Sequence, residues 1–203
     1  FLGIPLTEAT PDHSTMTGIR KRLPQEIFDQ VFGFVLDLAA KKKLLGGKTV
    51  AVDSTTLEAN AAMKSIVRKE TGEDYKQYLT KLANEAGIED PSDEDLRRFD
   101  KKRKDKTTSN DDWQSPTDPD AQITKMKDGR THLAYKAEHV IDVESEFLLH
   151  AAVHPATAGD AETLVDSVMN AEANLQSADG SMSVTEVVAD KGYHKGSTLE
   201  LCD

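Results

Sequence analysis

Val187-Val188-Ala189-Asp190 is a run of apolar, β-prone residues that stops on a carboxylate, and Val50-Ala51-Val52-Asp53 repeats the pattern earlier in the chain. If both runs are neighbouring parallel strands, about 4.8 Å apart, their aspartates project from the same edge of the sheet. Two carboxylates at that separation can share divalent cations, and two Mg²⁺ about 3.5–4 Å apart support phosphoryl transfer. The alternative is that each aspartate only caps the turn after its strand.

The rest of the chain predicts a mixed α/β fold. Alternating apolar residues at 133–141 and 147–153 predict two strands, and a helix with an apolar face begins at Asp160. Pro24 and the apolar residues that follow it at helical spacing predict that residues 1–47 form a helical N-terminal segment. The order of strand, insertion, strand, strand, helix and strand is typical of an α/β layout.

The composition of residues from about 66 to 112 predicts a charged insertion outside the sheet, because this stretch has too few apolar residues to supply a core strand. An acidic cluster precedes a basic one, and residues 97–106 hold seven Lys or Arg against two Asp, a local net charge of +5. This basic run is either a solvated helix face or a surface that follows DNA phosphates.

Composition limits the possible partners and compartments. The formal net charge of −11 excludes attraction of nucleic acid to the whole surface, so DNA contacts would come from local basic patches. No apolar run approaches the roughly 18 residues of a membrane span. Cys202 has no partner within the chain, and no signal peptide is visible, so we expect a cytoplasmic protein. Because the chain begins with Phe1, we also expect a fragment.

Several short motifs of the sequence resemble motifs of one protein family. Val-Ala-Val-Asp-Ser-Thr-Thr-Leu-Glu-Ala-Asn (50–60) resembles the first catalytic-aspartate motif of DDE transposases from bacterial insertion sequences, in the IS-four-like group, and Val-Val-Ala-Asp-Lys-Gly-Tyr (187–193) resembles their second. Pro-Asp-His-Ser-Thr (11–15) and the segments at 117–121 and 127–129 are also similar to this family. The resemblance covers nearly the whole chain outside the charged insertion.

The resemblance implies a ribonuclease H-like fold with the first and fourth strands side by side. Residues 48–203 would then be a partial catalytic core in which Asp53 and Asp190 hold Mg²⁺, or Mn²⁺ in its place. The family binds double-stranded DNA at element ends and target, where a homo-oligomer can assemble. Water first frees a 3′ hydroxyl, which then attacks the target phosphate.

The same resemblance implies a third acid that we do not find. The family places a Glu on a helix well beyond the second aspartate, whereas Glu200 follows Asp190 too closely and is not assigned this role. We therefore expect the third acid to lie beyond this chain, and the chain as given to bind metal weakly and to be inactive in strand transfer.

Eight residues are candidates for DNA contact because they are cationic or lie beside the second aspartate. They are Arg97, Arg98, Lys101, Lys102, Arg103, Lys104, Lys191 and Tyr193. Two alternatives to a transposase remain open: a non-catalytic DNA-binding remnant, and an unrelated α/β interaction module in which both aspartates are caps.

Overall fold

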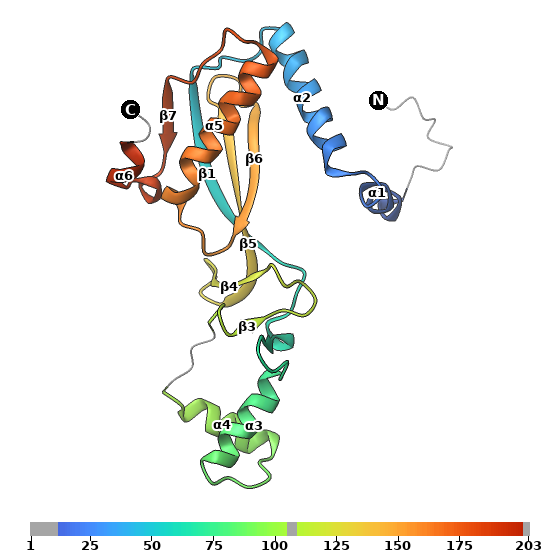
Figure 1. Ribbon diagram of the computed structural model, residues 1–203, viewed down its shortest axis with the longest axis vertical. Helices are drawn as coiled ribbons and strands as arrows, with labels where there is room; N and C mark the ends of the chain where they lie inside the picture. The colour runs from blue at the N-terminus through green and yellow to red at the C-terminus, as the bar shows by residue number, and fades with distance from the viewer. Residues whose placement is uncertain (1–11, 105–108, 201–203) are drawn as a thin grey trace.

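A five-stranded mixed sheet organises the computed structural model, which describes residues 12–104 and 109–200 (Figure 1). Its long central strand pairs antiparallel with three others, and the first strand pairs parallel with the last. This confirms the predicted α/β class and is consistent with a ribonuclease H-like fold. The strands are β1 (Thr49–Glu58), β4 (Gln122–Lys125), β5 (Thr131–Asp142), β6 (Leu148–Pro155) and β7 (Glu186–Ala189).

The two apolar runs are parallel neighbours, as predicted. Val50 pairs with Val187, and Val52 pairs with Ala189. The sequence prediction was wrong about where the first strand ends, because β1 continues past Asp53 and stays paired with β5 as far as Glu58. Asp53 therefore lies within a strand, and only Asp190 follows the end of one.

Strand β4 was not predicted. Ala134 of β5 pairs with both Glu58 and Gln122, so β4 must lie on the edge of β5 opposite β1, the same edge that β6 occupies. Ile123 is the buried residue of this strand. Four residues that follow a loop rich in Asp and Pro give too short an alternation to be detected from sequence.

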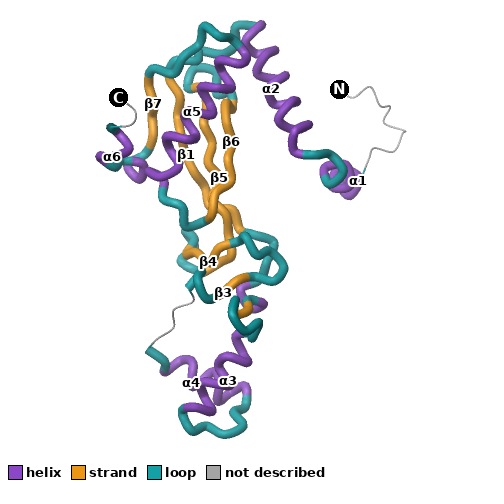
Figure 2. Tube along the Cα trace, viewed as in Figure 1, coloured by secondary structure: helices purple, strands orange, loops and turns teal. Residues whose placement is uncertain are grey.

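Helix α5 (Asp160–Ala178) covers one face of the sheet, and α2 (Gln25–Lys41) packs against α5 (Figures 1 and 2). Burying each leucine at this interface contributes about 1.5–3 kcal/mol relative to leaving it exposed. The buried residues shared by these elements include Leu36, Val50, Val52, Val140, Leu149, Leu164 and Leu175.

The N-terminal helices are only partly covered. None of the residues of α1 (His13–Arg20) is buried, and α2 exposes Val31, Phe34 and Leu38 on the side away from α5. Pro11 and the rest of residues 1–11 of the predicted N-terminal segment lie outside the described residues. The connection from α2 to β1 is held by the buried carboxylate of Asp142, which accepts hydrogen bonds from the backbone of Gly46 and Gly47.

The described residues of the segment 67–114 lie outside the five-stranded sheet, although Trp113 packs against Ile123 and Leu133 of that sheet. The two short strands of this segment, β2 (Val67–Arg68) and β3 (Trp113–Gln114), pair with each other in an antiparallel manner and not with the five-stranded sheet. Between them, α3 (Tyr75–Glu85) and α4 (Asp93–Lys102) pack together at the far end of the molecule from α2 (Figure 1). A short 3-10 turn, η1 (Met63–Ser65), precedes this segment.

After β7 the chain forms a 3-10 turn, η2 (Lys191–Tyr193), and the short helix α6 (Gly196–Leu199). Both lie close to the start of α5. Within the described residues, no helix has the length and apolarity that a membrane crossing requires.

Candidate active site

Asp53 lies one residue beyond the last pair that links β1 to β7, Val52 with Ala189. Its side chain is exposed and accepts a hydrogen bond from the backbone N–H of Ser54 at 2.8 Å. Since neighbouring residues of a strand alternate between faces and Val52 belongs to the core under α5, Asp53 lies on the opposite face of the sheet.

Asp190 directly follows β7, and its backbone stays extended, with φ −73° and ψ 174°. Oδ1 of this exposed carboxylate accepts from the backbone N–H of Gly192 at 2.7 Å, which caps η2. The capping alternative therefore describes part of what Asp190 does. An ionised carboxylate has about four acceptor positions, so one cap leaves capacity for a cation.

The fold thus places the two predicted residues directly after the last pair that links the two parallel strands, Val52 of β1 with Ala189 of β7. Within the described part of the chain, however, no three His, Cys, Asp or Glu side chains are grouped closely enough to hold a metal ion. Glu200 follows α6 as an exposed residue. The structure therefore supplies the backbone framework for two acidic ligands and does not add a third from the residues it describes.

Asp160 also lies near Asp190, although the sequence indicated it only as the first residue of a helix. A Cβ added to Gly192 would lie 2.8 Å from Oδ2 of Asp160 and 2.9 Å from Oδ1 of Asp190, so both carboxylates approach the same glycine. Gly192 is needed here for space and not for a left-handed backbone, since its φ is not positive. Asp160 is neutralised by Lys136, whose Nζ lies 2.8 Å from Oδ1.

Tyr193 is not available for the DNA contact that the sequence predicted. Its side chain is 2% exposed, and its hydroxyl donates to Oε2 of Glu138 at 3.0 Å. Burial raises the pKa of Tyr193, and Glu138 raises it further, so the hydroxyl stays protonated and remains a donor. The signal that could have revealed this contact is the pair Lys136 and Glu138, which place charge at alternate positions of a strand otherwise rich in apolar residues.

The other candidates for DNA contact lie in two places, on or near α4 and directly after Asp190. Arg97, Arg98, Lys101, Lys102 and Lys104 are exposed on or just after α4, at the far end of the molecule from β7 (Figure 1).

Arg103 is different from its neighbours, because its guanidinium lies 5.6 Å from the ring centre of Tyr78 and 3.4 Å from Asp100. It therefore takes part in the packing of the insertion. Lys191 is exposed directly after Asp190, which makes it the one cationic candidate that adjoins a predicted metal-binding residue in the chain.

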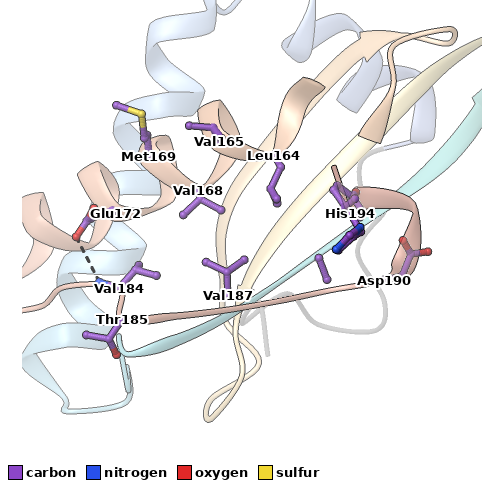
Figure 3. A pocket seen from close by; sticks show the side chains of 12 residues that line it. Leu164, Val165, Val168, Met169, Glu172, Val184, Thr185, Val187, Asp190 and His194 are labelled. Carbon is purple, nitrogen blue, oxygen red and sulfur yellow. Dashed lines mark hydrogen bonds between the residues drawn. The ribbon is translucent and has the colours of Figure 1, made fainter. Parts of the chain in front are cut away.

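A pocket of about 480 Å³ lies between α5 and β7 (Figure 3). Its walls are mainly apolar, with Leu164, Val168 and Val187 among them, and Asp190 and His194 stand together at one end. Apolar walls of this kind do not suit a polyanionic substrate, and Asp190 is the one aspartate that lines the pocket.

The mixed sheet, in which β1 and β7 are parallel neighbours and Asp53 and Asp190 directly follow their last paired residues, is consistent with a ribonuclease H-like fold. A comparison with protein families matches residues 45–203 to the family described as the transposase DDE domain, and the chain belongs to this family. No curated protein and no solved structure matches the chain.

Proposed function

We propose that this chain acts in the transposition of an insertion sequence of the IS-four-like group, with Asp53 and Asp190 as its metal-binding carboxylates. The observation that supports the proposal is the parallel pairing of β1 and β7, whose last pair, Val52 with Ala189, directly precedes the two aspartates. Membership of the transposase DDE domain family supports the same reaction class.

The donor set suits a hard divalent cation. Both carboxylates are exposed and supply only oxygen atoms, which Mg²⁺ and Mn²⁺ prefer. When bound, such a cation would activate the attacking oxygen and offset charge on the phosphate. The contribution of the chain is to bind and orient: the hydrogen bond from Gly192 fixes one oxygen of Asp190, and the Ser54 N–H fixes one oxygen of Asp53.

Two carboxylates are few ligands for a cation that demands near-octahedral coordination. We propose that the chain as given binds metal weakly and does not complete strand transfer, and that a further acid completes the site. Loss of positioning by about 1 Å costs on the order of a hundredfold in rate.

DNA is the proposed partner, contacted through local basic surfaces because the net charge of the chain is −11. Lys191 adjoins the site, and the exposed cations of α4 form a separate surface. Binding through these groups would weaken steeply with added salt. The cytoplasm is the proposed location, and a homo-oligomer on DNA the proposed assembly.

The test measures Mn²⁺ binding to the chain and to Asp53→Asn and Asp190→Asn, with Asp29→Asn on the exposed surface of α2 as the matched control. Because each substitution removes a charged ligand, we expect at least about tenfold weaker binding in the first two and no change in the control. Cleavage of element-end DNA is then compared between the chain and a form extended beyond Asp203.

Activity of the extended form that disappears with either aspartate is the expected result. Robust cleavage by the chain as given would contradict the need for a third acid. DNA binding that does not depend on Mn²⁺ would favour the non-catalytic DNA-binding remnant. Binding of neither Mn²⁺ nor DNA would favour the α/β interaction module.

A further inference from the structure

A fully buried carboxylate stands behind the proposed metal site. The Glu138 side chain is 0% exposed and lies between β5 and α5. It accepts from the hydroxyl groups of Ser167 at 2.5 Å, Thr163 at 2.7 Å and Tyr193 at 3.0 Å, and Nζ of Lys136 lies at 3.1 Å. Charge-assisted hydrogen bonds of this kind are stronger than neutral ones, so the side chain is held in one position.

Lys136 extends this cluster to the start of α5 and to β1. Its ammonium group contacts Glu138, the Thr163 hydroxyl at 2.8 Å and Asp160 at 2.8 Å. The Ser54 hydroxyl donates to the same oxygen of Asp160 at 3.1 Å. The cluster therefore ties together β1, β5 and the first turn of α5, the elements that surround the turn after Asp190.

Two connections run from the cluster to Asp190. Tyr193 ends η2, and its hydroxyl fixes that end of the turn to Glu138. In the middle of the turn, the Asp160 carboxylate occupies the space beside Gly192, whose N–H donates to Asp190. The turn is thus held by Glu138 at Tyr193 and bordered by Asp160 at Gly192, the glycine whose N–H orients the Asp190 carboxylate.

We infer that Glu138 and Tyr193 are positioning residues that orient the Asp190 carboxylate by fixing the η2 turn. The inference rests on the proposed function only where it concerns metal binding. Outer groups that orient a metal ligand typically change metal affinity by about 10–100-fold when they are removed.

The experiment uses the whole chain with Tyr193→Phe and Glu138→Gln. Tyr193→Phe removes one hydroxyl and keeps the ring, so the apolar packing is retained. Tyr75→Phe is the matched control, because the Tyr75 hydroxyl also donates to a carboxylate, that of Asp100 at 3.1 Å, but within the insertion. Two quantities are measured: the hydrogen-exchange rate of the Gly192 N–H by NMR, and Mn²⁺ affinity by electron paramagnetic resonance.

We expect Tyr193→Phe and Glu138→Gln to speed Gly192 exchange about tenfold and to weaken Mn²⁺ binding about tenfold. Amides at the β1–β5 pairing should exchange as before, and Tyr75→Phe should change neither quantity. Unaltered Gly192 exchange in Tyr193→Phe overturns the inference whatever the Mn²⁺ result, as does an equal effect of Tyr75→Phe.

Faster Gly192 exchange with unaltered Mn²⁺ affinity would mean that the order of the turn does not affect metal binding. That result also overturns the inference. If the unsubstituted chain shows no Mn²⁺ binding that depends on Asp53, the proposed function fails, and Gly192 exchange alone then decides whether the turn is positioned by Glu138.

Discussion

Charged side chains form ion pairs in two regions of this molecule under opposite conditions. Between β5 and α5, Lys136 lies 3.1 Å from Glu138, and the two side chains are 7% and 0% exposed. On α4, Arg98 lies closer to Glu94, at 2.5 Å, but these side chains are 68% and 73% exposed. Because water screens the closer pair, we expect the more distant, buried pair to matter far more when one partner is removed.

We therefore expect burial, and not distance, to decide how much a charge contributes to stability here. A buried charge is tolerated only when its hydrogen-bonding positions are filled, and Glu138 has four donors within 3.1 Å. All four donors share this one acceptor, so removing Glu138 takes the same partner from each of them. When one member of the exposed pair is removed, water hydrates the other member, and little stability is lost.

The largest effect is expected from Glu138→Ala. This change leaves the buried ammonium of Lys136 without one of its two carboxylates and removes the acceptor for Ser167 and Tyr193. Breaking a buried pair on one side costs about 3–5 kcal/mol in the free energy of unfolding, which urea denaturation measures. Glu94→Ala is the control, and a loss below about 1 kcal/mol for Glu138→Ala would contradict the role of burial.

Sequence patterns predicted the strands and the helix that carry long apolar runs. Burial of one face of an element gives its apolar residues a regular spacing, which the sequence shows directly. The parallel pairing of β1 and β7 was predicted from this repeat and from the family resemblance. The second half of β1 escaped detection because Ser54-Thr55-Thr56 is polar, although it remains paired with β5. Its strand structure comes from the partner strand and not from its own residues.

The cluster around Glu138 was not predicted from sequence. Lys136 and Glu138 alternate with the apolar residues that revealed β5, and such polar residues ordinarily face solvent. Here they face α5, where Thr163 and Ser167 supply hydroxyl groups one helical turn apart. Partners on separate elements meet only through the tertiary fold, so no local pattern indicates them.

Acid provides a second, smaller way to disturb the buried cluster. Burial raises the pKa of Glu138, but hydrogen bonds from Ser167, Thr163, Lys136 and Tyr193 lower it more, and the pKa falls below its usual value of 4.5. The unfolded chain therefore takes up this proton at higher pH than the folded chain does. The contribution to stability is complete above about pH 4.5 and is lost as the pH falls through the lower pKa of the folded state.

We therefore expect Glu138→Gln to flatten the fall of the unfolding free energy below about pH 4.5, measured by urea titration at a series of pH values. Other carboxylates also titrate in this range, so the comparison is made between variants and not with an absolute curve. Glu94→Gln is the control and should follow the unsubstituted chain. Parallel curves for Glu138→Gln and the unsubstituted chain would show that Glu138 does not contribute through its ionised form.

The smallest effect is expected at the exposed pair on α4. Glu94 lies in the first turn of the helix and Arg98 four residues later, the favourable order for such a pair. A double-mutant cycle with Glu94→Ala and Arg98→Ala isolates the coupling from the separate effect of Glu94 on the helix dipole. We expect a coupling of about 0.3–0.5 kcal/mol that disappears in 1 M salt, since exposed charges are screened there. A coupling above about 1 kcal/mol that survives salt would mean that short distance compensates for exposure, and the contrast between the two regions would no longer hold.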